Sequence, residues 1–343
     1  MTLVNRRWVV AAYPEGLPKL TDFRLETAEV PALRDGEVLV KVLYVSMDPG
    51  QRFYISRASG AEPLDQTVKA WGVGRVVESR SARFPVGSHV RDQQGECGVQ
   101  LYSAISEQDL TPVDADLPLP LHLGALGMVG QTAYFGMLAV GALKEGEAIL
   151  VTGASGAVGA IAGQIARIKG CRVIGVTGSA AKARHLVSEL GFDEAVDTSS
   201  DDLCARLTAL CPSGFDLFFD NVGGPLLDKC ILHMKRHGRI VSCGAASQYN
   251  NVGSWPGLQN YFEVGTRQLR FEGFYVGDYL DQFDKATKDL AHWIRSGDLR
   301  HEEDVRSGFE TFPDIFLALF TETRSGKLVL QLQDDEIWQQ KPE

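Results

Sequence analysis

The chain has 343 residues, 44% of them hydrophobic and 23% charged, and a formal net charge of -10 at pH 7. This length can form two domains with sizeable cores, whereas the acidic balance disfavours electrostatic binding to nucleic acid or to an anionic membrane surface. No apolar run approaches the ~20 residues that a membrane span needs. Tyr13, Pro14 and Glu15 interrupt the first apolar run, which excludes a signal-peptide core, so we expect a cytoplasmic protein.

Residues 1–125 contain short β-type runs separated by Gly, Pro and Asp. The segments 36–49 and 71–78 are predicted as strands, and "FPVGSHVRD" (84–92) is predicted as a turn followed by a strand. This part of the chain is therefore predicted to form a mostly-β module.

From about residue 126, apolar strand-like runs alternate with helical patterns. The predicted strands are 148–152, 171–177, 194–197, 216–220, 239–243 and 269–274. The helices predicted between the first five strands are 157–169, 180–190, 201–210 and 225–236. This alternation predicts an α/β fold with a Rossmann-type, doubly wound parallel sheet.

The last part of the chain predicts a helix over 282–296 that ends at Gly297. The segment "FPDIFLALFTETRSGKLVLQL" (312–332) then predicts a helix, a Ser-Gly turn and a last strand. Because that strand has no partner nearby in the sequence, we expect it to return to the first module.

A glycine-rich loop follows the first strand of the alternating part and opens a helix, which is the context of a dinucleotide-binding fingerprint. In "GASGAVG", Ala154 takes the first position of the pattern G-x-G-x-x-G, and Gly156 and Gly159 take the other two. Gly156 would let the backbone approach a pyrophosphate, and Gly159 would let the helix pack closely on the strand. A strand–helix turn without ligand is the alternative, and the alternation that follows favours the nucleotide site.

The nucleotide is predicted from the end of the second strand, where NAD-binding sites carry an Asp or Glu for the ribose 2′-hydroxyl. Here Gly178 and Ser179 leave room, and the cations Lys182 and Arg184 follow. A positive pair suits a 2′-phosphate, so the sequence favours NADP(H) over NAD(H). The alternative places Lys182 and Arg184 on the solvated face of the next helix.

Six cysteines are scattered along the chain without a C-x-x-C pair, so no disulfides are predicted. A catalytic zinc needs three protein ligands. Residues 1–125 offer only the dispersed Cys97, His89 and His122, and a Cys₄ lobe is absent. We therefore predict no metal site and argue against a zinc alcohol dehydrogenase.

Several segments form an ordered set along nearly the whole chain: "WVVAAYPEGLPKLTDFRL", "DGEVLVKVLYVSMDP", "GVGRVVES", "GMVGQTAYFGML", the loop segment 151–179, "FDNVGG", "SQYN", "GFETFPDIFLAL" and "SGKLVLQL". This set resembles the zinc-free double-bond reductases of the medium-chain dehydrogenase/reductase superfamily, the branch of prostaglandin, alkenal and curcumin reductases. The resemblance implies a GroES-like catalytic domain (1–125), a Rossmann NADP-binding domain (126–298) and a segment rejoining the catalytic domain (299–343). It also implies NADPH, an enone or alkenal substrate and a homodimer.

The resemblance also implies site residues. The pyrophosphate would lie at Ala157 and Val158, and the 2′-phosphate at Gly178, Ser179 and Lys182. The other residues that the resemblance places along the cofactor are Thr132, Asn221, Cys243, Gly244, Tyr249, Phe274, Val276 and Ser325. Three positions depart from the family: Gly50 and Thr198 stand where tyrosines are common, and Ser325 where an asparagine is common. These departures affect what the resemblance implies about the substrate pocket and about the preference for NADPH.

Enone reduction adds a hydride to the β-carbon and a proton to the α-carbon while negative charge develops on the carbonyl oxygen. Tyr249 is the candidate donor to that oxygen, shared with the ribose hydroxyl, because a phenol with a pKa near ~10 is protonated at neutral pH. Arg52 and Tyr54, after the "MDP" turn, are further candidates. Two alternatives stay open: an NADPH-dependent quinone reductase, and an NADPH-binding redox sensor without turnover.

Overall fold

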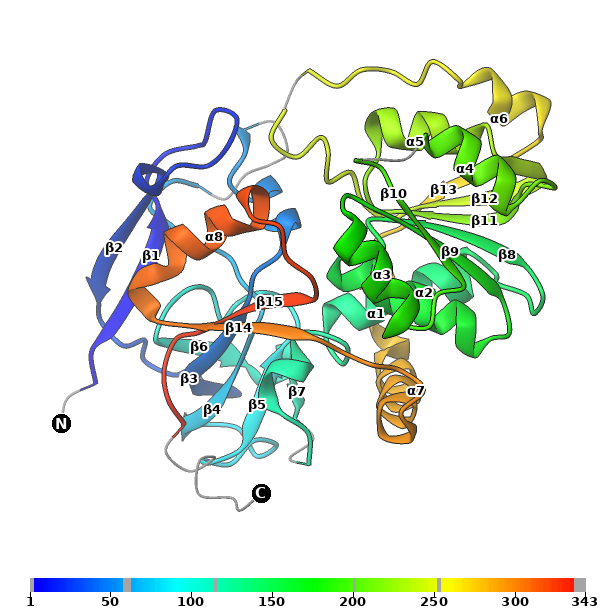
Figure 1. Ribbon diagram of the computed structural model, residues 1–343. Coiled ribbons are helices and arrows are strands. Elements are labelled where there is room, and N and C mark those ends of the chain that lie inside the picture. The colour runs from blue at the N-terminus through cyan, green and yellow to red at the C-terminus, as the bar shows by residue number, and fades with distance from the viewer. Residues whose placement is uncertain (1–2, 58–62, 114–115, 200–201, 252–253, 336–343) are drawn as a thin grey trace. The chain divides into compact units, whose positions relative to one another are not determined.

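The computed structural model describes residues 3–57, 63–113, 116–199, 202–251 and 254–335 (Figure 1). The chain divides into two compact units. The first unit comprises the described residues up to Leu123, those of Glu303–Thr323 and those from Lys327 onward. The second unit comprises those of Gly124–Glu302 together with Arg324–Gly326.

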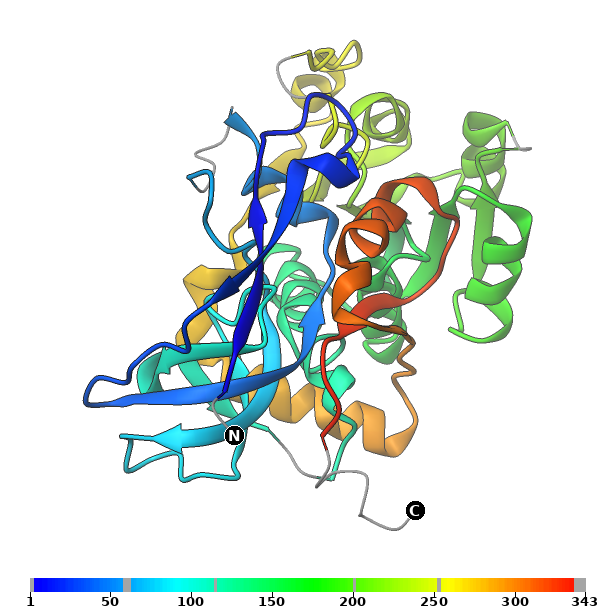
Figure 2. The same ribbon diagram turned by 90° about the vertical axis from the view of Figure 1, so that its left-hand side faces the viewer.

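The first unit is built on a seven-stranded sheet with the order β14-β15-β3-β4-β5-β7, in which β6 also pairs with β3. Its strands are β3 (Glu37–Ser46), β4 (Gly72–Ser79), β5 (His89–Asp92), β6 (Tyr102–Ser106), β7 (Leu110–Pro112), β14 (Glu303–Ser307) and β15 (Lys327–Gln331). A separate antiparallel pair is formed by β1 (Asn5–Val10) and β2 (Phe23–Ala28), as Figure 2 shows. The mostly-β character predicted for this part is confirmed.

The C-terminal strand β15 lies between β14 and β3 in this sheet, antiparallel to β3 and parallel to β14. Helix α8 (Phe312–Thr321) precedes it and packs aromatic residues into the core of the unit. The ring of Phe23 lies 5.1 Å from that of Phe312 and 5.4 Å from that of Phe316, both in edge-to-face geometry. The last strand therefore finds its partners within the module that begins the chain.

The second unit contains a six-stranded sheet with the order β10-β9-β8-β11-β12-β13, in which every pairing is parallel. Its strands are β8 (Ala148–Thr152), β9 (Arg172–Thr177), β10 (Glu194–Asp197), β11 (Phe215–Asp220), β12 (Met234–Ser242) and β13 (Arg270–Gly273). This order confirms the predicted doubly wound sheet. The strand order reverses between β8 and β11, where such sheets bind ligands beyond the carboxyl ends of their strands.

Helices cover both faces of this sheet (Figure 1). The α-helices of the second unit are α1 (Met128–Phe135), α2 (Ala157–Ile168), α3 (Ala180–Ser188), α4 (Leu203–Leu210), α5 (Gly224–Ile231), α6 (Phe262–Thr266) and α7 (Phe283–Ser296). The short helical segments of both units are η1 (Leu20–Asp22), η2 (Pro49–Phe53), η4 (Glu107–Asp109), η5 (Leu119–His122), η6 (Gly136–Val140), η7 (Val276–Gln282) and η8 (Phe309–Thr311). Within the described residues, every helix is too short or too polar to cross a lipid bilayer.

The predicted end of the helix over 225–236 and the predicted start of the strand over 239–243 are both wrong. The helix predicted over 225–236 ends at Ile231, and residues 234–236 lie in β12. Leu227, Ile231 and Met234 have helical spacing, which explains the error. Met234 instead pairs with Phe215 in the sheet and is fully buried there. The start of the helix predicted at 201 lies outside the described residues, and α4 is described from Leu203.

Candidate functional site

The glycine-rich loop makes a tight turn between β8 and α2. Gly153 has a φ of +59°, a left-handed conformation that glycine adopts without strain, and its carbonyl accepts a 2.9 Å hydrogen bond from the N–H of Gly156. A Cβ at Gly159 would lie 2.4 Å from the Gly153 oxygen and 2.9 Å from the Cα of Ala154. The third glycine of the fingerprint is therefore required for the helix to approach the loop.

The N-terminus of α2 fits a phosphate group. Gly156 is its N-cap and provides no side-chain cap, and the first turn contains no acidic residue. The first N–H groups of a helix lack intrahelical acceptors and carry a partial positive charge. Ala157 and Val158, predicted to contact the pyrophosphate, are partly exposed at this end. The residues present thus suit a dinucleotide, and the individual contacts stay predictions.

A buried carboxylate ties the loop to the neighbouring strand. The Asp220 carboxylate at the end of β11 accepts a 2.6 Å hydrogen bond from the hydroxyl of Thr152 and bonds from the N–H groups of Val222 and Gly223. Burial raises the pKa of Asp220. The amide of Asn221 donates to the carbonyl of Thr152 at 2.8 Å. Asn221 therefore lies beside the fingerprint loop, at the point where the strand order reverses.

The end of β12 continues this arrangement. The N–H groups of Cys243 and Gly244 both donate to the carbonyl of Asp220, at 2.9 and 3.1 Å. Burial, together with the nearby Asp220, raises the pKa of the Cys243 thiol to about 12. That thiol is protonated at neutral pH, so the geometry gives Cys243 no nucleophilic role.

Tyr249 folds back onto this strand end. Its hydroxyl oxygen accepts a 3.2 Å hydrogen bond from the N–H of Ala245, and a Cβ at Gly244 would lie 2.9 Å from the same oxygen. Burial raises the pKa of Tyr249 above its usual value of 10. The phenol is therefore protonated at neutral pH, and accepting the Ala245 bond does not consume its proton.

The end of β9 carries the residues predicted to bind a 2′-phosphate. A Cβ at Gly178 would meet no atom within 4 Å, so the space beside it is open. The hydroxyl of Ser179 accepts a 3.4 Å bond from the N–H of Lys182 and caps α3. Lys182 is half-buried, whereas Arg184 is exposed. The Thr198 hydroxyl, in the position where the family often has tyrosine, donates to the carbonyl of Thr177 at 3.2 Å.

A segment distant in the sequence also reaches this region. Gly326 pairs its backbone with Gly156 in a single parallel β-bridge. This pairing brings the predicted residue Ser325 next to the fingerprint loop, together with Arg324. Arg324 is not among the predicted site residues, because nothing in the local pattern of "TRSGK" indicates which distant segment Arg324 will contact.

Three other predicted residues lie on elements around this half of the site. The hydroxyl of Thr132 donates to the Met128 carbonyl at 2.7 Å within α1. Phe274 follows β13 and packs against Gly136, where a Cβ would lie 2.9 Å from its ring. Val276 begins η7. Their contacts to a cofactor stay predictions.

In the first unit, Arg52 is an interior residue. Its side chain is 1% exposed and donates to the carbonyls of Pro14 and Gly16 at 2.9 and 3.0 Å. Burial lowers the pKa of Arg52, although a guanidinium stays charged. This geometry fits a residue that positions the loop at 14–16, and contact with a substrate stays a prediction.

Tyr54 lies in an aromatic and cationic cluster directly after η2. Its ring centroid is 6.0 Å from that of Trp71, and the Lys69 ammonium lies 5.4 Å from the Tyr54 centroid. The preceding turn is fixed by Lys327 of β15, which bonds to Asp48 at 2.5 Å and to the Met47 carbonyl at 2.8 Å. The "MDP" turn and the residues after it are thus held in one arrangement within this unit.

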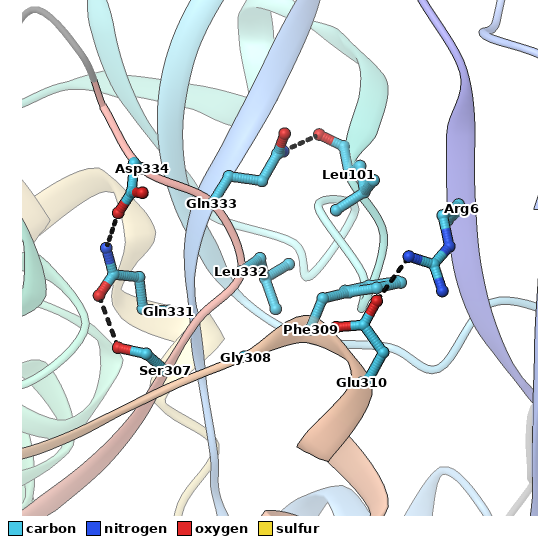
Figure 3. A pocket seen from close by; sticks show the side chains of 10 residues that line it. All are labelled: Arg6, Leu101, Ser307, Gly308, Phe309, Glu310, Gln331, Leu332, Gln333 and Asp334. Atoms are coloured by element: carbon cyan, nitrogen blue, oxygen red, sulfur yellow. Dashed lines mark hydrogen bonds and ion pairs between the residues drawn. The ribbon is translucent and has the colours of Figure 1, made fainter.

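A groove of about 350 Å³ also opens on the first unit (Figure 3). Its polar side chains are largely paired with one another: Arg6 bonds to Glu310 at 2.6 Å, and Ser307 bonds to Gln331 at 2.9 Å. None of the predicted site residues lines it. The groove therefore adds nothing to the candidate site.

Comparison with known families matches both parts of the chain. The family described as "N-terminal domain of oxidoreductase" matches residues 6–113, and the family described as "Zinc-binding dehydrogenase" matches residues 157–292. Despite the second description, the described residues of this chain contain no group of three or more His, Cys, Asp or Glu side chains that could hold a metal ion.

Individual relatives extend over nearly the whole chain. Prostaglandin reductase 1 of Rattus norvegicus is 39% identical, covering 95% of this chain and 98% of its own length. The NADPH-dependent curcumin reductase of Escherichia coli is 36% identical over 97% of this chain and 98% of its own. The crystal structure of CurA from Vibrio vulnificus in complex with NADPH superposes with a TM-score of 0.89, at 33% identity, over 96% of this chain and 100% of that one.

Proposed function

Because the chain belongs to the zinc-free branch of the medium-chain dehydrogenase/reductase superfamily that holds the prostaglandin, alkenal and curcumin reductases, we propose that it reduces the carbon–carbon double bond of α,β-unsaturated ketones or aldehydes. The cofactor is NADPH, which supplies the hydride when bound. The enzyme is thus an NADP-dependent reductase of enones and 2-alkenals.

The position of Tyr249 is the observation that carries this proposal. Its protonated hydroxyl lies at Gly244, on the same edge of the sheet as the fingerprint loop and Asn221. A hydride added to the β-carbon leaves negative charge on the carbonyl oxygen, and a donor fixed in a buried setting stabilises that charge. In this role Tyr249 donates to the oxygen without being deprotonated, and water can supply the proton for the α-carbon.

The test is NADPH and NADH oxidation by the purified protein with a panel of alkenals, enones and quinones. We expect turnover of enones and alkenals with NADPH that a chelator does not change. Turnover of quinones alone would replace the proposal with a quinone reductase. Tight binding of NADPH without turnover of any acceptor would indicate a redox sensor instead.

The edge strand β13 supports a homodimer as a further part of the proposal. All four residues of Arg270–Gly273 are exposed, and among the described strands β13 pairs only with β12. An uncovered edge with Phe271 41% exposed is a natural surface for pairing with a second copy. Sedimentation of the wild type and of Phe271→Lys tests this: we expect a dimer that the substitution weakens, and a monomeric wild type would contradict it.

We also propose that the enzyme works in the cytoplasm. All six cysteines are free thiols, which fits a reducing compartment. Fractionation of cells that express a tagged full-length chain tests this assignment, and recovery with secreted or membrane fractions would overturn it.

A further inference from the structure

Two segments that are distant in the sequence meet on one face of α3. The His185 imidazole of α3 lies 2.7 Å from the Glu302 carboxylate. A Cβ at Gly326 would lie 2.6 Å from the Glu302 carbonyl, so the segment Arg324–Gly326 rests directly against residue 302. Lys182 and His185 are three residues apart and share a face of the helix. These contacts place the segment that carries Arg324 against residue 302, which in turn contacts the helix that carries Lys182.

Gly326 makes a second contact. The β-bridge between Gly326 and Gly156 joins it to the loop predicted to hold the pyrophosphate. Gly326 has a φ of +73°, and its close approach to Glu302 leaves no room for a side chain there. Gly326, two residues after Arg324, is therefore held by contacts with both Glu302 and the fingerprint loop.

Electrostatics agrees with this placement. Burial is the main cause that lowers the pKa of Lys182, and the positive charge of Arg324 lowers it further. Such an effect on the Lys182 pKa is what a like charge nearby produces, and it agrees with the placement given by the backbone contacts. An anion bound between Lys182 and Arg324 would relieve the repulsion between the two cations and attract both.

The neutral hydroxyls in this region already take part in hydrogen bonds. The Ser179 hydroxyl accepts the N–H of Lys182 as the cap of α3, and the Thr198 hydroxyl donates to Thr177. Thr198 also lacks the length of the tyrosine that the family often has at its position. Beside Gly178 the space is open. A dianionic phosphate at this place would need positively charged side chains to balance its charge.

We propose that Arg324 and Lys182 form a two-cation clamp for the 2′-phosphate of NADPH, and that Arg324 determines much of the preference for NADPH over NADH. This inference rests on the proposed cofactor. A guanidinium can bind two phosphate oxygens at once in a planar geometry, whereas the ammonium of Lys182 acts as a point charge. The C-terminal segment would then contribute a nucleotide-specificity residue.

The test measures equilibrium dissociation constants for NADPH, NADH and 2′,5′-ADP with the full-length wild type, Arg324→Gln, Arg324→Lys and Lys182→Gln. Lys288→Gln is the control, since Lys288 is an exposed cation on α7 and is not among the predicted site residues. We expect Arg324→Gln to raise the Kd of NADPH and 2′,5′-ADP by about 10- to 100-fold and to change the Kd of NADH less than twofold. Arg324→Lys should recover part of the loss, and Lys288→Gln should match the wild type.

Two results separate the possible failures. If the wild type binds NADPH and Arg324→Gln leaves the ratio of the NADPH and NADH constants unchanged, the clamp is wrong and the proposed function stands. If the wild type binds neither NADPH nor 2′,5′-ADP, both are overturned. Thermal unfolding of each variant shows whether the substituted chains are folded, and a folded Arg324→Lys variant keeps the test decisive if Arg324→Gln is unstable.

Discussion

The hydroxyl of Thr152 donates a 2.6 Å hydrogen bond to the carboxylate of Asp220, and both side chains are fully buried. This bond joins the carboxyl ends of β8 and β11, the two strands between which the order of the sheet reverses. It holds the start of the fingerprint loop and the start of the Asn221 segment in one geometry. The nucleotide half of the site is thus organised around a carboxylate that is not itself exposed to a ligand.

Replacement of Asp220 by Asn should change how stability depends on pH. Burial raises the folded-state pKa of Asp220 above its usual 3.8, so the stability due to this group is fully present below the unfolded pKa and is lost as the pH rises through the folded pKa. The stability of the wild type relative to Asp220→Asn should therefore decrease as the pH rises. Urea unfolding at a series of pH values measures this difference, and an increase with pH would contradict the prediction.

Replacement of Gly159 by Ala should loosen the fingerprint loop. The added methyl would meet backbone atoms, the Gly153 oxygen at 2.4 Å and the Ala154 Cα at 2.9 Å, which cannot rotate away. We expect a loss of about 1–3 kcal/mol in unfolding free energy and weaker NADPH binding. Gly265→Ala is the control, since no atom lies within 4 Å of a Cβ at that helical glycine. Equal effects of the two substitutions would argue against the packing explanation.

The parallel sheet and its loop could be predicted because their signals are local. The strand predicted over 148–152 is β8 over the same residues, and the helix predicted from 157 begins there. Continuous apolar runs bounded by glycine are typical of strands buried on both faces. The helix predicted over 282–296 likewise ends before Gly297, whose φ of +78° closes it in a left-handed cap.

The return of the last strand to the first module is expected from its lack of a local partner, but other features that depend on distant pairing could not be predicted. The spacing of Leu227, Ile231 and Met234 is helical, and only the pairing of Met234 with Phe215 draws it into β12. Arg324 carries no local signal, since its importance arises from the bridge between Gly326 and Gly156. Such contacts depend on the tertiary arrangement of strands, which a periodic pattern does not contain.

Replacement of Lys327 by Met should destabilise the first unit. Lys327 is 3% exposed, and its ammonium bonds to Asp48, whose side chain is 27% exposed, and to the Met47 carbonyl. Loss of the cation leaves the carboxylate without its charged partner, which we expect to cost about 2–4 kcal/mol. Chemical unfolding measures this change. The control Lys285→Met removes an ion pair with Asp289 whose lysine is 73% exposed, and should change stability by less than about 1 kcal/mol.

Replacement of Tyr249 by Phe tests the donor to the carbonyl oxygen. The substitution keeps the ring and removes the hydroxyl that lies at Gly244. Loss of a fixed donor to a developing oxyanion should lower kcat/KM for an enone by about 10- to 100-fold. The Kd of NADPH should be unchanged, because the hydroxyl acts on the charge of the transition state.

The pH dependence and a second tyrosine complete this test. Because burial raises the pKa of Tyr249 above 10, the donor stays protonated through the neutral range, and the wild-type rate should show no fall from this group below pH ~10. The control Tyr261→Phe alters a tyrosine that is 68% exposed and should keep wild-type kinetics. Full enone turnover by Tyr249→Phe would exclude the donor role and leave the ribose hydroxyl of the cofactor to stabilise the enolate.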